Sequence, residues 1–339
     1  MNYGGLILIE VLVSFALTFY LRRYALHKSL LDIPNARSSH STPTPRGGGV
    51  AIVVSHILAI TLMVWAGMLD RYAFIAMAGA GLLIAVIGFI DDHNHIAARW
   101  RLFGHFAAAA WGLFWLGGLA ALNFWDASLD LGLPGSIIAA FYLVWMLNLY
   151  NFMDGIDGIA SVEALCVCGG AVLLYVLTGH PDLVWMPLAL AAAVAGFLVW
   201  NFPPAKIFMG DAGSGFLGVS LGLLSLQAGW TSSSLLYAWL ILLGVFVVDA
   251  TVTLGRRLLR GDKVYEAHRS HAYQFASRRY GSHLPVTLAV AVINVVWLLP
   301  VALAVAVFGL EGIIGIFIAY LPLVILAIRF QAGELERNG

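Results

Sequence analysis

Residues 72–92 read YAFIAMAGAGLLIAVIGFIDD, an uncharged apolar run that ends on two adjacent aspartates. An α-helix rises about 1.5 Å per residue, so about 20 apolar residues are needed to cross a hydrocarbon core about 30 Å thick. This run has that length and closes with Asp91 and Asp92. It therefore predicts a membrane-spanning helix that ends at a polar boundary.

The composition of the whole chain supports the same interpretation. Of its 339 residues, 61% are hydrophobic and only 11% are charged, whereas charged residues make up about a quarter of an ordinary soluble domain. A water-soluble enzyme is therefore excluded, and the lipid bilayer is the expected surrounding. The formal net charge is zero and no segment is a block of like charges, so nucleic acid is not an expected partner. Cys166 and Cys168 lie within an apolar run and support neither a disulfide framework nor a zinc site.

Apolar runs of spanning length recur along the chain, separated by short loops. We expect an all-α polytopic membrane protein of about eleven transmembrane helices, which forms one integral membrane domain over residues 1–339. The expected spans are 4–21, 47–69, 72–90, 102–120, 134–150, 159–178, 183–200, 213–229, 235–254, 285–308 and 311–328. The first run has no basic segment before it and no cleavage signature after it, so we expect it to be retained as a helix.

Lysine and arginine predict the orientation. If the loops alternate between the two sides of the membrane, Arg71 is the one basic residue of 18 that falls outside the cytoplasmic loops. This places the N-terminus outside and the C-terminus in the cytoplasm. Carboxylates that follow the third, fifth and seventh spans gather on the cytoplasmic side as well. We therefore expect one active site there, built by loops at about 22–46, 91–101, 151–158, 201–212 and 255–284.

The first acidic motif is the pair Asp91 and Asp92. Adjacent carboxylates at a helix terminus repel each other unless a cation or a proton neutralises one of them. A divalent metal or a cationic partner would do so. If the pair stood alone, a solvated helix end would be an equally good interpretation, but two further acidic motifs are expected at the same face.

The second motif is NLYNFMDGIDG, residues 148–158. Its two Asp-Gly pairs predict a tight polar turn, in which glycine permits close approach of the backbone to a ligand. The side chains of Asn151, Asp154 and Asp157 offer hard oxygen donors of the kind that bind divalent cations. The alternative is a loop that is merely rich in turn-forming residues.

The third motif is NFPPAKIFMGDAGSGFLG, residues 201–218. Two prolines stop the seventh span, and Lys206 and Asp211 precede a Gly-Ser-Gly opening of the eighth. The free amides and the positive dipole end of such a helix start favour phosphate, so Asp211 suits a site for metal and phosphate. The alternative is that the small residues serve helix packing.

Two cytoplasmic loops supply basic residues. In loop 255–284, His268 and His271 would share a face if the segment were helical, with Arg269 beside them as a forked phosphate donor. In the first loop, Arg46 precedes three glycines that open the second span. The alternative for these basic residues is the positive-inside bias together with contact to anionic lipid headgroups.

The motifs PRGGG, GFIDD, NLYNFMDGIDG, FMGDAGSGFLG and AHRSHAYQ follow one another in this order. With them, the chain from about Leu31 to Gln274 resembles the polyprenyl-phosphate N-acetylhexosamine-1-phosphate transferases of glycosyltransferase family 4. The resemblance implies a multi-pass enzyme of the bacterial inner membrane that transfers a sugar 1-phosphate from a UDP-N-acetylhexosamine to undecaprenyl phosphate at the cytoplasmic face, with Mg²⁺ or Mn²⁺ as cofactor. The form of the histidine segment resembles the members that initiate O-antigen synthesis and disfavours the muropeptide substrate.

The motifs and the resemblance together give a set of candidate site residues. The candidate catalytic groups are Asp91, Asp92 and Asp154, and the candidate metal ligands are Asn151 and Asp211. The candidate substrate contacts are Arg46, Asp157, Lys206, His268, Arg269 and His271. The family pattern has a glutamine where this chain has His105. Which N-acetylhexosamine is used and which loop histidine contacts the diphosphate stay open, as does the role of Glu10 within the first span.

The chemistry of the transfer fits these residue types. A lipid phosphate attacks the β-phosphorus of the UDP-sugar and UMP leaves, so a divalent cation and basic donors have to offset the charge. The second pKa of a phosphomonoester is about 6, so the acceptor is largely dianionic at neutral pH and a general base is optional. Asp91 is therefore either a base or a positioning group. A transporter and an intramembrane lipid-phosphate metallohydrolase are the alternatives, and a homodimer is left open.

Overall fold

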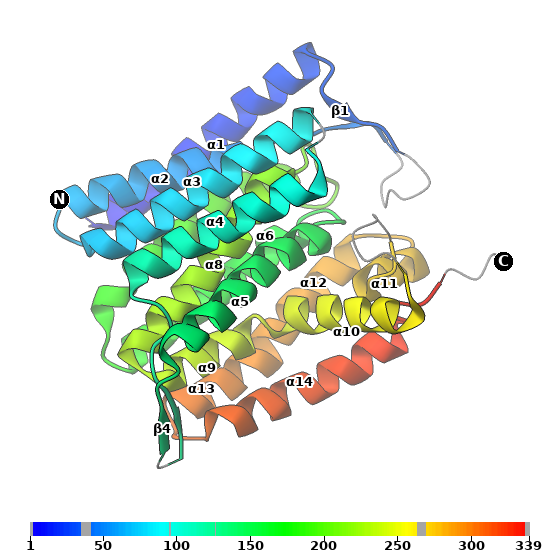
Figure 1. The fold of residues 1–339 in the computed structure, drawn as a ribbon. Coiled ribbons are helices and arrows are strands. Elements are labelled where there is room, and N and C mark those ends of the chain that lie inside the picture. The colour runs from blue at the N-terminus through cyan, green and yellow to red at the C-terminus, as the bar shows by residue number, and fades with distance from the viewer. Residues whose placement is uncertain (1–2, 35–41, 95, 126, 263–268, 336–339) are drawn as a thin grey trace.

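The computed structural model describes residues 3–34, 42–94, 96–125, 127–262 and 269–335. Within these residues, eight helices are long and apolar enough to cross a membrane, or nine if one bent pair forms a single span. The helices lie side by side in one bundle, with the N-terminus at one end and the C-terminus at the other (Figure 1). The chain is an all-α polytopic membrane protein, as the sequence predicts.

Every expected span coincides with at least one helix. The α-helices are α1 (Tyr3–His27), α2 (Val50–Trp65), α3 (Arg71–His93), α4 (Ala98–Leu116), α5 (Gly132–Met153), α6 (Ile159–Leu177), α7 (Trp185–Asn201), α8 (Asp211–Thr231), α9 (Ser233–Leu242), α10 (Gly244–Arg260), α11 (Ala272–Tyr280), α12 (Leu284–Ile293), α13 (Leu299–Ala306) and α14 (Gly312–Arg329). A 3₁₀ turn, Pro181–Leu183, precedes α7, and a π-helix, Asn294–Leu298, joins α12 to α13.

The count of about eleven spans stays a prediction. Helix α2 has only 16 residues, and α4 carries Arg99 and Arg101 in its first turn. The expected span 235–254 is a bent pair, because α9 and α10 meet at an angle of 68°. Helix α1 extends beyond the expected 4–21 by running on to His27.

Two small antiparallel hairpins lie at opposite ends of the bundle (Figure 1). One pairs β1 (Leu31–Asp32) with β2 (Thr44–Pro45) near the C-terminal end, and the other pairs β3 (Leu122–Phe124) with β4 (Ala127–Leu129). With strands of two or three residues they do not change the fold class. The first hairpin does, however, fix the loop that leads into α2.

Helix α8 is the buried axis of the bundle. It packs against α3 and α5, with α2, α4 and α9 around them, and its residues from Ala212 to Leu226 are all buried. Glycine makes the closest approach feasible: a Cβ on Gly218 would lie 2.6 Å from the Cα of Leu147 in α5. Small residues of this kind let membrane helices approach and gain dispersion contacts. The approach also brings the C-terminal ends of α3 and α5 close to the start of α8.

The acids inside the bundle contact polar groups from other helices. Glu163 of α6 accepts a hydrogen bond from Asn294 at 2.6 Å, which links α6 to the π-helix between α12 and α13. The backbone of Phe246, near the start of α10, lies close to the same carboxylate. Glu10 of α1 lies 3.6 Å from Nδ1 of His56 in α2.

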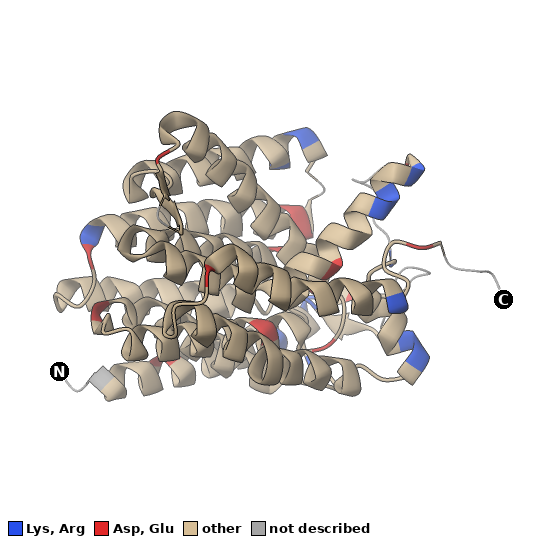
Figure 2. Cartoon of the chain, turned by 90° about the horizontal axis from the view of Figure 1, so that it is seen from below, with Lys and Arg blue, Asp and Glu red and all other residues tan. Residues whose placement is uncertain are grey.

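Charge is distributed unevenly between the two ends of the bundle. Figure 2 shows that Lys and Arg gather at the end that carries the C-terminus. Arg71 is the first residue of α3, at the end of that helix away from Asp91 and Asp92. The structure thus places the predicted loops at a common end, and the assignment of this end to the cytoplasm stays a prediction.

Candidate active site

A cluster of one arginine and two aspartates joins three segments at the basic end of the bundle. Nη2 of Arg46 lies 2.6 Å from Oδ1 of Asp92 and 2.7 Å from Oδ1 of Asp211. The aspartates come from the end of α3 and the start of α8. Burial alone would lower the pKa of Arg46, but the charges of Asp211 and Asp92 raise it above its usual value. The guanidinium thus bridges two carboxylates that would otherwise repel each other.

Backbone pairing holds Arg46 in this place. The amide of Phe208 donates to the carbonyl of Pro45 at 2.8 Å, and the amides of Gly48 and Gly49 donate to the carbonyls of Phe208 and Met209 at 2.9 Å each. The segment before α2 therefore runs alongside the segment before α8. The sequence places these two segments far apart, and the pairing brings the PRGGG and FMGD motifs together.

Asp92, which belongs to α3, also caps the N-terminus of helix α8. Its Oδ1 accepts from the amide of Asp211 at 3.2 Å and its Oδ2 from that of Ala212 at 3.5 Å. Gly88, one turn earlier in α3, permits this approach, because a Cβ there would lie 2.6 Å from the backbone of Asp211. A carboxylate at a helix N-terminus satisfies unpaired amides and the helix dipole. The amides that the sequence predicts for phosphate are therefore already bonded to Asp92.

Asp91 points to a different partner from its neighbour. Its Oδ2 lies 2.5 Å from Nη1 of Arg101 in α4, and its Oδ1 accepts from the amide of Ile96 at 2.8 Å. Only 5% of the Asp91 side chain is exposed. These side chains line a cavity of about 50 Å³, together with Asn151 and Asp211. Both carboxylate oxygens of Asp91 thus have a partner in the protein, an arrangement that suits a positioning group.

The second motif adds an amide and a carboxylate beside this cavity. Nδ2 of Asn151, in the last turn of α5, donates to Oγ of Ser214 in α8 at 3.3 Å. Asp154 follows directly at the end of α5. Burial raises the pKa of Asp154 well above its usual value, and the negative charge of Asp211 raises it further. The carboxylates of the three acidic motifs therefore lie within electrostatic reach of one another, as the sequence predicts.

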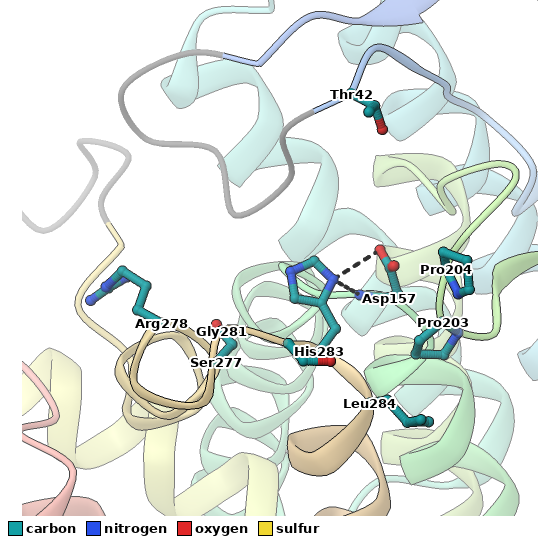
Figure 3. Close-up of a pocket in the computed structure, with 10 residues that line it drawn as sticks. Thr42, Asp157, Pro203, Pro204, Ser277, Arg278, Gly281, His283 and Leu284 are labelled. Atoms are coloured by element: carbon teal, nitrogen blue, oxygen red, sulfur yellow. Dashed lines mark hydrogen bonds and ion pairs between the residues drawn. The ribbon is translucent and has the colours of Figure 1, made fainter.

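Asp157 faces a larger pocket next to this cluster. The pocket holds about 530 Å³ and is lined by Pro203, Arg278 and His283, among others. Figure 3 shows the side chains of Asp157 and His283 pointing toward each other in its wall. Oδ1 of Asp157 lies 3.2 Å from Nδ1 of His283, and Oδ2 accepts from the amide of Ala205 at 3.0 Å.

Residues 269–271 of the histidine segment are not helical. Helix α11 begins only at Ala272, and His271 is its N-cap residue. The amides of Ala272 and Tyr273 donate to Asp249 of α10 at 2.9 and 3.0 Å, and Nδ1 of His271 lies 3.3 Å from the same carboxylate. With 2% exposure, His271 is buried at this junction. Its predicted contact with substrate stays untested.

Two other basic candidates, Lys206 and Arg269, have contacts with residues outside the acidic motifs. Lys206 is exposed, and its Nζ lies 5.4 Å above the ring of Trp200. The carbonyl of Arg269 accepts a hydrogen bond from Nη2 of Arg278 at 3.2 Å, so Arg269 lies against α11. His268 falls outside the described residues. The structure therefore brings Arg46 to the acidic motifs, whereas the ammonium of Lys206 lies over the ring of Trp200.

Three residues that shape the site are absent from the sequence-based list. Arg101 pairs with Asp91, Asp249 holds the start of α11, and Asn201 links two site loops. Asn201 accepts from the amide of Gly158 at 3.1 Å and donates to the carbonyl of Ile207 at 3.0 Å. A buried polar residue beside a loop motif was the available signal for Asp249 and Asn201, but neither sequence nor spacing identifies their partners.

The donor set matches the chemistry of a magnesium site. Carboxylates and an amide oxygen are hard ligands, and the raised pKa of Asp154 means that this carboxyl would give up its proton to a cation that binds there. In the described part of the chain, no three His, Cys, Asp or Glu side chains converge closely enough to form a ready metal cage. Mg²⁺ commonly binds through one or two carboxylates together with substrate phosphates, so the set fits an ion that arrives with a diphosphate.

Comparison with known proteins identifies the family. Residues 74–229 match the model of glycosyl transferase family 4. The chain is 32% identical over 314 residues to the decaprenyl-phosphate N-acetylglucosaminephosphotransferase of Mycolicibacterium smegmatis, an alignment that covers 77% of this chain and 73% of the relative. It is 28% identical over 298 residues to the probable undecaprenyl-phosphate N-acetylglucosaminyl 1-phosphate transferase of Bacillus subtilis, with 86% and 81% covered. The chain belongs to glycosyl transferase family 4, among the polyprenyl-phosphate N-acetylhexosamine-1-phosphate transferases.

Proposed function

We propose that this protein transfers N-acetylglucosamine 1-phosphate from UDP-N-acetylglucosamine to undecaprenyl phosphate and releases UMP. The observation that carries the proposal is the convergence of Arg46, Asp92 and Asp211 beside Asp91 and Asp154, at one end of a membrane bundle. Such an end meets both substrates, because the polyprenyl chain lies in lipid while the nucleotide arrives from water. Both relatives are named as transferases of N-acetylglucosamine phosphate, which favours N-acetylglucosamine among the N-acetylhexosamines.

The proposed reaction is a displacement at phosphorus. An oxygen of the lipid phosphate forms a bond to the β-phosphorus, the bond from this phosphorus to the bridging oxygen breaks, and UMP departs with that oxygen. No proton has to be removed from a largely dianionic phosphomonoester at neutral pH. The side chains therefore act mainly by binding charge and by orienting the two phosphates.

Each side chain in the cluster has a proposed part. Asp211, Asn151 and Asp154 would hold Mg²⁺, or Mn²⁺ in its place. The ion, when bound, offsets the diphosphate charge and polarises the phosphorus centre. Asp92 would keep Arg46 in place, and the guanidinium would stabilise negative charge on the diphosphate once Asp211 turns from it to the ion. Asp91, fixed by its arginine partner, orients the acceptor at the membrane boundary, since a base is not needed.

The pocket beside Asp157 is the proposed place of the nucleotide. Its volume of about 530 Å³ suits a nucleoside, and its wall combines a carboxylate, an arginine and several hydroxyl groups. That arginine is Arg278. The histidine segment His268 to His271, together with Arg269 and Lys206, is assigned to substrate binding on the resemblance alone.

The cellular setting is also part of the proposal. The basic end of the bundle is assigned to the cytoplasm of a bacterial inner membrane, because UDP-sugars are made in the cytoplasm and the charge distribution favours that orientation. The product would start a cell-surface polysaccharide. O-antigen is the polysaccharide that the form of the histidine segment favours, and a cell-wall polymer is the alternative.

Release of UMP by the purified protein tests the proposal. UDP-N-acetylglucosamine and magnesium are supplied with and without undecaprenyl phosphate, and UMP is quantified. We expect UMP only when the lipid is present. A transporter would release none, and a hydrolase that acts on the UDP-sugar would release it without lipid. Either of those results would refute the transferase.

A further inference from the structure

The contact between Asp157 and His283 joins two parts of the chain that no sequence motif links. Nδ1 of His283 lies 3.2 Å from Oδ1 of Asp157, and the backbone amide of Asp157 points its hydrogen at the same ring nitrogen from 3.4 Å. His283 is the residue before α12, whereas Asp157 belongs to the turn between α5 and α6. Both side chains are largely buried, with 16% and 12% exposed, yet both line the nucleotide pocket (Figure 3).

Three contacts together fix Asp157. His283 holds one carboxylate oxygen, and the amide of Ala205 donates to the other at 3.0 Å. Oγ1 of Thr287, one turn into α12, donates to the carbonyl of Asp157 at 2.8 Å. The hydroxyl therefore anchors the backbone, while the histidine and the amide determine how the carboxylate is turned. These are separable tasks, and a mutation can address each of them.

The negative charge of Asp157 favours the tautomer of His283 that carries hydrogen on Nδ1. At 3.2 Å from a carboxylate oxygen, an unprotonated Nδ1 would direct its lone pair at negative charge. The contact in which the Asp157 amide would donate to Nδ1 is longer, at 3.4 Å, and a charge-assisted hydrogen bond from Nδ1 to the carboxylate oxygen is the stronger of the two. A carboxylate oxygen accepts two bonds, so each oxygen of Asp157 keeps one acceptor position after its protein partner is counted. Those positions are available to hydrogen-bond donors of a ligand in the pocket.

We propose that His283 is a positioning residue for the nucleotide donor, which acts by fixing the carboxylate of Asp157. The inference rests on the proposed function, because it assumes that the pocket beside Asp157 receives the nucleotide. It adds a residue from the start of α12, a helix that the acidic motifs do not include. It also explains why a histidine is suitable, since the side chain has to bring a donor to a carboxylate from a helix start.

The test compares His283→Leu, which removes the donor, with His283→Asn, whose amide nitrogen occupies about the place of Nδ1. His283→Leu is expected to raise KM for UDP-N-acetylglucosamine about tenfold, because an oriented, charge-assisted hydrogen bond is lost, with little change in kcat or in KM for undecaprenyl phosphate. His283→Asn should restore KM to within about threefold of the unmodified protein. His180→Asn, at the opposite end of the bundle, is the matched histidine control and should change nothing.

A double-mutant cycle distinguishes positioning from a direct contact or a structural effect. In an Asp157→Asn background, His283→Leu should raise KM no further, because its effect passes through the carboxylate. An unchanged KM in His283→Leu would overturn the inference, as would a full additional effect in that background. Equal loss in the Asn and Leu variants, accompanied by lower thermal stability in detergent, would also overturn it. Absence of lipid-dependent UMP release by the unmodified protein would instead refute the proposed function.

Discussion

Asp211→Asn is expected to reduce turnover about a thousandfold while the protein stays folded. The substitution keeps the size of the side chain and an oxygen that accepts from Arg46, which now lies 2.7 Å away. It removes the negative charge that a divalent cation would bind. The change therefore separates the proposed metal-binding role of this side chain from its structural role.

The two expected effects differ in size. A quarter of the Asp211 side chain is exposed, so replacing an ionic bond to Arg46 by a neutral one should cost only about 1 kcal/mol of unfolding free energy. Losing a charged ligand should cost about 4 kcal/mol of transition-state stabilisation, which corresponds to about a thousandfold in rate at about 1.4 kcal/mol per factor of ten. Activity should therefore fall far more than stability.

The assay is lipid-dependent UMP release at saturating magnesium, measured beside thermal unfolding in detergent. Asp70→Asn is the matched control, because Asp70 also stands at a helix start and its Oδ2 accepts from the amide of Ala73 at 2.9 Å. That control lies at the opposite end of the bundle and should keep its activity. Near-normal turnover in Asp211→Asn would refute the ligand assignment, and a loss of activity matched by a loss of folded protein would point to structure instead.

The remaining predictions concern the loop junction, the cation and the topology. Asp249→Ala removes the acceptor of two α11 amides and should destabilise this junction by about 2 kcal/mol or more. Proteolysis within 255–284 should then be faster, and unchanged cleavage would contradict the capping role. Chelation of divalent cations should abolish UMP release, and Mg²⁺ or Mn²⁺ should restore it; activity in chelator would exclude a metal. Because burial raises the pKa of Asp154, a bound cation has to displace a proton there, so the apparent magnesium affinity should strengthen as pH rises, and a flat titration would argue against Asp154 as ligand. In a cysteine-free background, cysteine at Ala98 should react only from the cytoplasm and cysteine at Ser128 only from outside; labelling of both from one side would refute the topology.

The helices were largely predictable because hydrocarbon demands long uninterrupted apolar runs. The segment from Tyr72 to Ile90 specifies its helix by composition alone. The break between α9 and α10 was not predictable, since the apolar run that contains it is uninterrupted in the sequence. Helix α11 was missed as well, because its start depends on Asp249, about one loop away in sequence.

The site was predictable as a gathering of motifs but not as a set of contacts. Alternation of the loops placed the acidic motifs at one end, and the structure brings them together there. Adjacent helix residues point about 100° apart, so Asp91 and Asp92 reach different arginines, Arg101 and Arg46. No sequence pattern reveals that choice. Nor does it reveal that Asp92 occupies the α8 amides that a glycine-rich helix start would offer to phosphate.

The central claim is that the phosphorus atom next to the sugar moves to the lipid. It is tested most directly with UDP-N-acetylglucosamine that carries a phosphorus radiolabel at the β position. After reaction with undecaprenyl phosphate, the label should be found in the lipid extract, while label placed at the α position should leave as UMP. Recovery of the β label in water-soluble UDP would show transfer of the sugar without its phosphate, and would contradict the reaction proposed for this site.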